Sequence, residues 1–186
     1  YAYAALEQGS RLVPYTLERR ELRHDDVSIE ILYSGVCHSD LHMAKNDWGR
    51  TVFPLVPGHE IVGKVIAIGK DVNKFKIGDH VAVGTFVDSC MHCDQCHKGE
   101  EHMCREILTE TYNGQDRMTG ENTAGGYAKY IVVKEHFVLH VPDRLDLSRV
   151  APLLCAGITT YSPLRTWNVG PGTRVGVVGL GGLGHM

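Results

Sequence analysis

Four of the six cysteines fall in one short segment, at Cys90, Cys93, Cys96 and Cys104. The two-residue gaps between the first three let successive thiolates converge on one tetrahedral zinc ion, at bond lengths of about 2.3 Å. Disulfide bonds are the main alternative, but the C-x-x-C-x-x-C spacing and the lack of a signal-peptide pattern favour a reducing compartment and a metal. Because four thiolates leave no open coordination position, the segment predicts a structural zinc ion.

The other two cysteines, Cys37 and Cys155, lie far apart in the chain, with His59-Glu60 between them. Two thiolates and one neutral imidazole balance the charge of Zn²⁺ and leave a fourth position for water or an alcohol oxygen. A zinc ion of this kind acidifies the oxygen it binds, and Glu60 could be a transient ligand. The same residues could instead be ordinary core side chains, since free cysteine packs as a small apolar residue. Spacing alone therefore allows a catalytic zinc site without requiring one.

A glycine-rich turn follows an apolar run near the end of the chain, in Val175-Gly-Val-Val-Gly179-Leu-Gly181-Gly182-Leu183-Gly184. A strand that enters GxGxxG is typical of a dinucleotide site, because glycine permits the tight turn and lets the backbone approach the pyrophosphate closely. The acidic or basic residue that reads the ribose would come about 20 positions later, beyond Met186. The pattern predicts a strand over 174–178 and a helix opening after the turn.

The composition is that of a globular protein, with 43% hydrophobic residues, 22% charged residues and a net charge of −3. This slightly acidic balance, without a basic run, argues against a nucleic-acid partner. No apolar stretch approaches the roughly 20 residues needed to cross a bilayer, so we expect no membrane partner.

Short strands between turns predict that the first part of the chain is rich in β-structure. Strands are expected where apolar residues alternate or cluster, at 27–33, 61–68, 80–86, 127–133 and 137–141. Helices are expected at 38–45, capped by Ser39 or Asp40, and at 148–165, interrupted near Gly157 and Pro163.

The character of the sequence changes around residues 142–150, which predicts two domains. Residues 1–145 form the β-rich domain, and residues 146–186 supply a linking helix, one strand and the glycine turn of an α/β domain. The chain begins without Met, at Tyr1, and stops inside the dinucleotide motif. We therefore expect it to be a fragment whose α/β domain is truncated.

Five segments taken together resemble the medium-chain zinc-dependent alcohol dehydrogenases, most closely their cinnamyl-alcohol-dehydrogenase-like branch. They are 35–42, 58–60, the four-cysteine segment, 154–161 and 179–184. The resemblance covers essentially the whole chain in order. It implies a GroES-like β domain that carries both zinc sites, followed by a Rossmann domain.

The resemblance assigns roles to the residues of the second metal cluster. Cys37, His59 and Cys155 match the catalytic zinc ligands, and Glu60 matches an acidic residue that can exchange with the oxygen at the metal. Asp40 matches a carboxylate that orients the histidine, which agrees with the usual need to fix the tautomer of a ligand imidazole. The four clustered cysteines match the structural zinc lobe.

The resemblance also assigns residues to proton transfer and to cofactor binding. Ser39 and His42 match a proton relay from the alcohol to solvent, and Thr159 would lie beside the nicotinamide. His38 stands where several relatives carry Arg near the pyrophosphate, which is a departure from those members. The remaining cofactor contacts are expected from Gly179, Gly181, Gly182, Leu183 and Gly184.

The resemblance implies a cytoplasmic NAD(P)(H)-dependent alcohol dehydrogenase that interconverts primary alcohols and aldehydes. It implies two zinc ions per chain, NADP(H) rather than NAD(H), and a homodimer or homotetramer, while the 186-residue chain alone is expected to be inactive. A polyol or secondary-alcohol dehydrogenase of the same family is one alternative, and a zinc-free quinone-reductase-like relative, which typically lacks these cysteines, is another. A non-catalytic zinc-binding interaction module would have no use for Cys37, Cys155 or the glycine turn.

Several other residues invite simpler interpretations. His24, His80, His97 and His136 are expected at the surface or in strands, because histidine is of intermediate burial. Trp48 is expected to contribute to packing rather than to line a pocket, and Gly125-Gly126 to form a turn.

Overall fold

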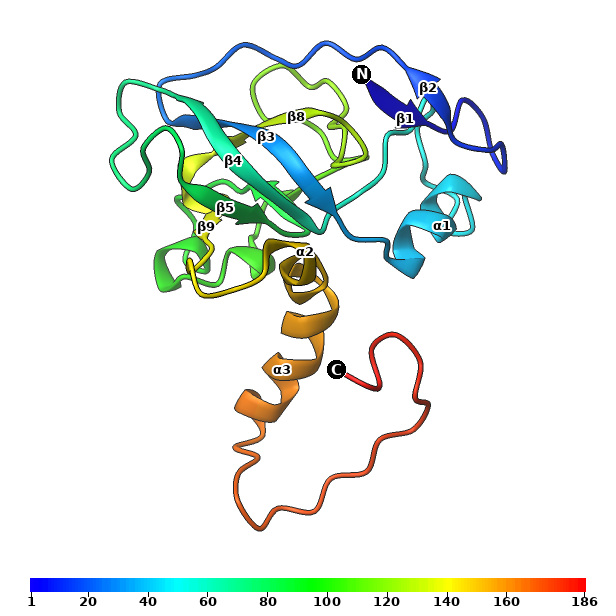
Figure 1. The fold of residues 1–186 in the computed structure, drawn as a ribbon, viewed down its shortest axis with the longest axis vertical. Coiled ribbons are helices and arrows are strands. Elements are labelled where there is room, and N and C mark those ends of the chain that lie inside the picture. Colours follow the sequence, from blue (N-terminus) through cyan, green and yellow to red (C-terminus); the bar gives the residue numbers. More distant parts are fainter.

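The computed structural model describes all residues from 1 to 186, and every strand lies within the first 140 of them (Figure 1). The main sheet has five antiparallel strands in the order β8-β3-β4-β5-β9. Their bounds are β3 Asp26–Ser34, β4 Ile61–Ile68, β5 His80–Val83, β8 Tyr130–Lys134 and β9 Val138–His140. A β-rich domain was expected for residues 1–145, and the strands occupy that part of the chain.

The core lies where the apolar faces of these strands meet. Val27 and Ile29 of β3 are fully buried, and Ile29 is paired with Val65 of β4 and with Ile131 of β8. Fully burying a side chain of this size contributes about 1.5–3 kcal/mol. Gly63 of β4 has a steric role, because a Cβ there would come within 2.4 Å of the Glu30 carbonyl oxygen on the neighbouring strand.

The expected strand boundaries are met in some places and shifted in others. The strand over 61–68 coincides with β4, whereas the expected strand over 80–86 is divided into β5 and β6 (Phe86–Asp88). The expected strand over 127–133 begins only at Tyr130, and that over 137–141 is reduced to β9 after a single 3₁₀ turn (η3, Glu135–Phe137). The late start of β8 has a clear cause, because the backbone N–H of Tyr127 donates to Pro57 instead of to a strand.

Two small sheets complete the β-structure. Strands β1 (Ala2–Ala4) and β2 (Val13–Tyr15) form one of them, and β6 pairs with β7 (Thr109–Glu110) in the other. The four-cysteine segment is the excursion between β6 and β7, and it contains two 3₁₀ turns, η1 (Cys96–Lys98) and η2 (Glu101–Met103).

Helix α1 (His38–Ala44) begins two or three residues earlier than the predicted caps suggest. Its N-cap residue is Cys37, not Ser39 or Asp40. Asp40 instead occupies the third helical position, and its Oδ2 accepts a hydrogen bond from the Cys37 N–H at 3.0 Å. This arrangement satisfies a backbone donor that the helix itself cannot pair.

The helical region after the sheet is divided into three parts: α2 (Leu147–Val150), the 3₁₀ turn η4 (Ala151–Leu154) and α3 (Ala156–Thr166). The interruption was expected near Gly157 and Pro163, but the break falls at Cys155, whose φ of −130° and ψ of −71° are not helical. Pro163 lies inside α3 without ending it. The Asp146 side chain caps α2 by accepting from Ser148 N–H at 3.0 Å.

The strand expected over 174–178 is not formed. After α3 the chain runs as an extended loop that turns back toward the helix (Figure 1). Val175 and Val177 are more than half exposed, and Val178 is fully exposed. A strand needs neighbours that pair its backbone and cover its side chains, and no strand of this chain lies beside this segment.

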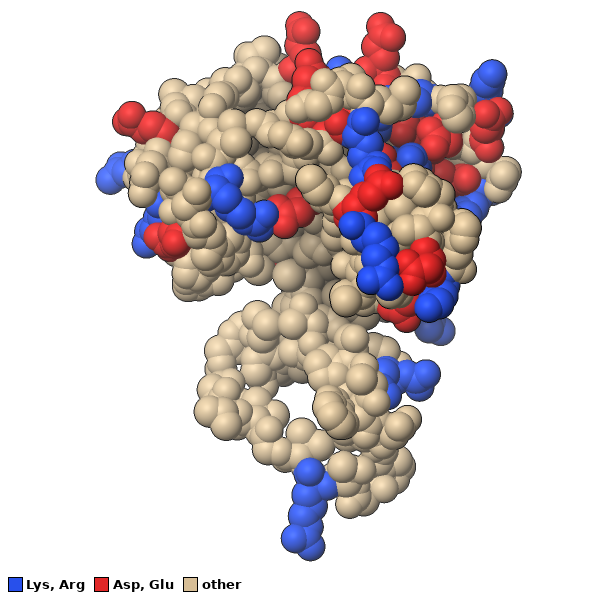
Figure 2. All heavy atoms as spheres, turned by 180° about the vertical axis from the view of Figure 1, so that it is seen from behind, with Lys and Arg blue, Asp and Glu red and all other residues tan.

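A network of ion pairs ties the N-terminal loop to the loop that follows β7. Arg23 donates to both carboxylate oxygens of Asp116, at 2.8 and 3.0 Å, and Arg20 pairs with Asp26 and with Asp116. Figure 2 shows charges of both signs interspersed over the β domain, whereas the region beyond α2 carries a few basic side chains and no acidic ones.

None of the helices combines the length and the apolar character needed to span a membrane.

Candidate active site

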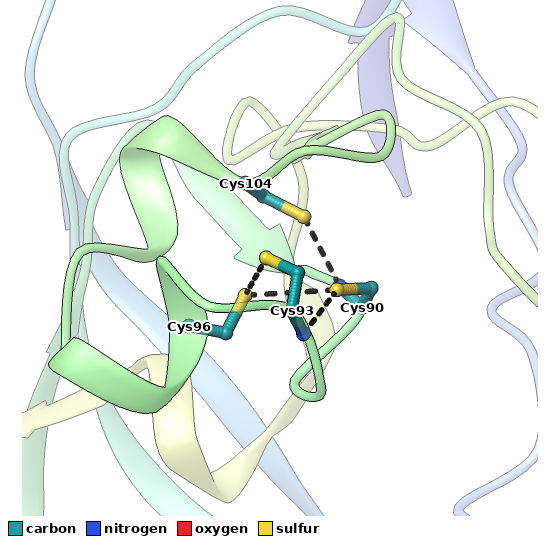
Figure 3. Close-up of side chains that lie close together, drawn as sticks. All are labelled: Cys90, Cys93, Cys96 and Cys104. Atoms are coloured by element: carbon teal, nitrogen blue, oxygen red, sulfur yellow. Dashed lines mark hydrogen bonds between the residues drawn. The ribbon is translucent and has the colours of Figure 1, made fainter.

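The side chains of the four-cysteine lobe lie close together (Figure 3), and their sulfurs are spaced as in a tetrahedral metal site. The Cys90 and Cys96 sulfurs are 3.8 Å apart, those of Cys93 and Cys96 are 3.5 Å apart, and all four sulfurs lie within 4.8 Å of one another. A tetrahedron with metal–sulfur bonds of about 2.3 Å has edges of about 3.8 Å. All six cysteines of the chain are free, and these separations are far longer than a disulfide bond of about 2.05 Å. The lobe therefore fits a Cys₄ zinc ion.

Backbone N–H groups point at the sulfurs of this lobe. The N–H of Cys93 lies 3.3 Å from Cys90 Sγ, and the N–H of Arg105 lies 3.5 Å from Cys93 Sγ. Hydrogen bonds from the backbone of Arg105 and Cys96 lower the pKa of Cys93 to about 6. Such donors stabilise the thiolate form, which is the form that binds metal.

A side-chain contact anchors the lobe to the main sheet. His136, next to β9, lies 2.7 Å from a carboxylate oxygen of Glu101 in the lobe. His136 is exposed, as are His24 and His97, while His80 is a partly buried residue of β5, so these four histidines lie where they were expected.

The second cluster assembles residues from three distant parts of the chain. Cys37 lies between β3 and α1, His59 and Glu60 directly precede β4, and Cys155 lies between η4 and α3. The Cys37 and Cys155 sulfurs are 3.9 Å apart, and one ligand atom from each of the four residues lies within 4.8 Å of the others. The fold thus brings together four residues that spacing alone could not group, in a donor set that suits zinc.

The Asp40 carboxylate contacts His59 and the backbone around this cluster. Its Oδ1 lies 3.2 Å from His59 Nδ1 and accepts from the Gly58 N–H at 3.1 Å, while its Oδ2 accepts from Cys37 N–H and from the Tyr127 hydroxyl, both at 3.0 Å. With Nδ1 donating to Asp40, the His59 nitrogen left for a metal is Nε2. A carboxylate that fixes the ring in this way is the usual support of a ligand histidine.

The electrostatics of the cluster favour a cation. Burial disfavours the charged form of His59, but hydrogen bonds to Asp40 and Cys155, together with the charges of these partners, raise the pKa of His59 to about 11. Burial raises the pKa of Glu60, which is 3% exposed. A metal ion could take over the positive charge that the His59 proton otherwise supplies, since metal binding releases ligand protons.

A cavity of about 220 Å³ adjoins the cluster. It is lined by Ser39, Met43, Trp48, Arg50, His59, Thr85, Glu110, Tyr112 and Cys155. Trp48, expected to serve packing alone, is a cavity wall and is 49% exposed. The Arg50 guanidinium lies 5.8 Å from the centre of the Trp48 ring and pairs with Glu110 at 3.0 Å. The cavity thus has aromatic walls and an ion pair among its lining residues.

The expected relay residues lie on α1 beside this cavity. Ser39 lines it, whereas His42 packs its ring against His38 and Trp48, with centroid distances of 4.8 and 5.3 Å. His42 Nδ1 lies 2.8 Å from a carboxylate oxygen of Asp47. Ser39 and His42 are three residues apart on the helix, where side chains are neighbours, but no direct hydrogen bond joins them.

The expected cofactor residues are not gathered into one site. Thr159 lies on α3, one turn after Cys155, and its N–H donates to the Cys155 carbonyl at 2.9 Å. Gly179–Gly184 lie in the C-terminal loop, where His185 Nδ1 and Met186 N–H bond to carbonyl oxygens of the same segment. His38 is exposed on α1.

Two tyrosines that were not predicted as site residues belong to the site. Tyr112 is 6% exposed and packs its ring 5.6 Å from that of His59, and Tyr127 binds Asp40. Isolated aromatic residues carry no spacing signal. For Tyr127 a clue was available in Gly125-Gly126, because a double glycine can mark a close approach of two backbones.

Comparison with known proteins agrees with this geometry. Residues 23–143 match the family described as alcohol dehydrogenase GroES-like domain. The chain is 53% identical over 186 residues to NADP-dependent alcohol dehydrogenase C 1 of Mycolicibacterium smegmatis, covering 100% of this chain and 53% of that protein. It is 54% identical to the aldehyde reductase YahK of Escherichia coli, with the same coverage.

Among solved structures, the cinnamyl alcohol dehydrogenase SbCAD4 from Sorghum bicolor superimposes with a TM-score of 0.97 at 48% identity. The match covers 100% of this chain and 53% of that one, so the chain spans about half the length of these relatives. The fold and the family match agree with the resemblance seen in the sequence, and the chain belongs to the medium-chain alcohol dehydrogenases through their GroES-like domain.

Proposed function

We propose that residues 1–186 provide the metal and substrate sites of a zinc-dependent, NADP(H)-linked alcohol dehydrogenase that interconverts primary alcohols and aldehydes. The observation that carries the proposal is the convergence of Cys37, His59 and Cys155, of which His59 and Cys155 line a cavity large enough for a small organic substrate. The names of the relatives support the reaction class, and the substrate and cofactor are our inference for this chain.

Cys37, His59 and Cys155 would hold a zinc ion, with Glu60 close enough to exchange as a ligand. Zinc with an open position supplies Lewis-acid chemistry, which polarises a carbonyl and acidifies an alcohol. Cys90, Cys93, Cys96 and Cys104 would hold a second zinc ion that supports the lobe without taking part in the reaction.

The proton of the alcohol needs a path from the cavity to solvent. The Ser39 hydroxyl lies in the cavity wall and can accept and donate a proton, and His42 lies partly exposed one helical turn away. Asp47 holds the His42 ring through Nδ1, which leaves Nε2 available for exchange. Because the two side chains are not directly bonded, the path needs a connection between them, such as a water molecule or a cofactor hydroxyl.

The walls of the cavity favour a flat or apolar substrate. Trp48, Met43 and Tyr112 supply aromatic and thioether surface, which packs well against a planar aldehyde. A polyol would need several hydrogen-bond partners along its length, and Arg50 and Glu110 already bind each other. Primary aldehydes with an unsaturated or aromatic group therefore fit this cavity better than polyols do.

NADP(H) is proposed because relatives of this chain are named as NADP-dependent. Thr159 on α3 and the turn over 179–184 would contact the cofactor, with His38 on the other side of the site. The strand before the turn would form only when further strands lie beside it.

The test joins residues 1–186 to the second half of alcohol dehydrogenase C 1 of M. smegmatis. Oxidation of NADPH at 340 nm with cinnamaldehyde is the assay, and we expect turnover that 1,10-phenanthroline abolishes. Cys37→Ser should lower this rate by about 100-fold or more, because Lewis-acid stabilisation is worth several kcal/mol. His97→Gln, at an exposed position of the lobe, is the matched control. Undiminished turnover in Cys37→Ser would refute the proposed site.

A further inference from the structure

A segment with two glycines lies directly against the loop that carries His59. Gly125 N–H donates to Val56 at 2.8 Å, Gly126 N–H to Gly58 at 2.8 Å, and Tyr127 N–H to Pro57 at 2.9 Å. A Cβ on Gly125 would come within 2.4 Å of the carbonyl oxygens of Pro57 and Gly58. The two segments, distant in the chain, are therefore held together by a short backbone ladder that only glycine permits.

The Tyr127 side chain continues this contact toward the metal cluster. Its hydroxyl donates to Asp40 Oδ2 at 3.0 Å, and the other oxygen of the same carboxylate faces His59 Nδ1 at 3.2 Å. Burial and the charge of Asp40 raise the pKa of Tyr127 well above its ordinary value, so the hydroxyl remains a donor. Tyr127 thus restrains the group that orients the imidazole.

Arg19 holds the same segment from its other side. Its guanidinium donates to three backbone carbonyls that flank Tyr127, those of Ala124, Gly125 and Tyr130, and no carboxylate pairs with it. Burial lowers the pKa of Arg19 to about 10. Even a partly buried cation without a carboxylate is costly unless its donors are satisfied, and here the planar fork of Arg19 is satisfied by backbone carbonyls alone.

We propose that Tyr127 is a positioning residue for His59, acting through Asp40, and that Arg19 fixes Tyr127 for this task. The inference rests on the proposed metal site at Cys37, His59 and Cys155. A carboxylate with four donors around it cannot rotate, so the imidazole it binds has one orientation. Groups that support a ligand histidine typically change metal affinity by 10- to 100-fold.

The simpler role for Tyr127 is packing, since its ring joins an apolar cluster with Ala2, Ala4 and Val56. Tyr127→Phe separates the two roles, because it keeps the ring and removes only the hydroxyl. The matched control is Tyr15→Phe, since Tyr15 packs in the same cluster and its hydroxyl makes no hydrogen bond.

The experiment titrates the metal-free chain with Co²⁺, whose visible ligand-field and thiolate bands report the geometry of each site. The wild-type chain should take up two equivalents, assigned to the two clusters by Cys37→Ser and Cys93→Ser. In Tyr127→Phe, Co²⁺ should bind the Cys37–His59–Cys155 site about 10-fold more weakly and with shifted ligand-field bands. The Cys₄ site in the same molecule should be unchanged and serves as an internal reference.

The outcomes distinguish failure of the Tyr127 positioning role from failure of the proposed metal site. A wild-type chain that binds only one equivalent would overturn the metal site itself. Equal Co²⁺ affinities in wild type and in Tyr127→Phe would overturn the positioning role. Equal weakening of Co²⁺ binding at both sites, or the same loss of affinity in Tyr15→Phe, would also overturn it. Arg19→Lys keeps the charge but cannot reach three carbonyls, so it should weaken the same site while the Cys₄ site keeps its affinity.

Discussion

The sulfur of Cys37, at the beginning of α1, lies 3.9 Å from that of Cys155, at the beginning of α3, although 118 residues separate them. The contact places the segment between β3 and α1 next to the residue that precedes α3. Cys155 interrupts the helical region, so the residue that separates η4 from α3 also belongs to the candidate metal cluster.

The two clusters should respond differently to loss of one thiol. Cys93→Ser should remove one zinc equivalent and lower Tm by roughly 10 °C, since losing about 3 kcal/mol shifts Tm of a protein of this size by about 6–12 °C. Cys37→Ser should also remove one equivalent and leave Tm within about 3 °C. Elemental analysis and calorimetry on chelator-free protein measure both effects, and equal Tm losses would contradict the division of roles.

Gly58 should be far less tolerant of a side chain than another glycine with a similar backbone. Its φ is +102°, and a Cβ there would come within 2.7 Å of the Tyr127 ring and 2.9 Å of the Gly126 nitrogen. Gly99 also has a positive φ, +74°, but open space around it.

We therefore expect Gly99→Ala to lower the free energy of unfolding by about 1 kcal/mol, and Gly58→Ala by about 2 kcal/mol more because of the added overlap. Urea unfolding curves measure the difference. Equal losses in the two variants would show that the contact between the two segments relaxes without cost.

Asp116 should make the free energy of unfolding depend on pH in the acidic range. Burial disfavours its charge, but hydrogen bonds from Arg23 and from the backbone of Thr119 outweigh this and hold the pKa of Asp116 below its ordinary 3.8. A carboxylate with a depressed pKa in the folded state stabilises the fold above the unfolded pKa and loses this contribution as pH falls below about 4. The slope approaches about 1.4 kcal/mol per pH unit between the two pKa values.

Asp116→Asn should therefore be less stable than wild type at pH 7, and the gap should narrow between pH 4 and pH 2. Asp143→Asn, at an exposed carboxylate without an ion pair, is the control and should change little. Chemical unfolding at several pH values is the measurement. A gap that stays constant with pH would mean that Asp116 acts through its turn geometry and not through its charge.

The 186-residue chain by itself should bind zinc and yet fail to reduce aldehydes with NADPH. The turn over 179–184 has no sheet around it, and hydride transfer needs the cofactor held within about 3–3.5 Å of the reacting carbon. Absorbance at 340 nm, with zinc content measured on the same sample, checks both statements. Clear turnover by this polypeptide would show that these residues suffice to hold the cofactor.

Local patterns in the sequence were enough to predict β4 and the Cys₄ lobe. The apolar run over 61–68 forms a strand along its whole length, with Ile61, Val62 and Val65 fully buried. The four closely spaced thiols of the lobe lie within 4.8 Å of one another. For Cys37, His59 and Cys155, spacing alone did not decide between a metal site and ordinary core residues. Only the resemblance assigned them to one site. Their proximity depends on how the end of β3, the start of β4 and α3 meet, which is a property of the whole fold.

Other features depended on long-range contacts that no local pattern contains. Tyr112 reaches His59 because the chain returns past the cavity after β7, and Trp48 is a cavity wall because the turn after α1 places it there. The run over 174–178 has the composition of a strand, but it forms no ladder without neighbours. The composition of this segment is compatible with a strand, but a strand forms only where neighbouring strands pair with it.

Cys155 also links the direction of α3 to the candidate metal ligands, because it lies between η4 and α3. Its φ and ψ are not helical, so the chain leaves the helical path at the residue whose thiol lies 3.9 Å from that of Cys37. A change in these two backbone angles would therefore alter both the direction of α3 and the position of the Cys155 thiol relative to Cys37 and His59.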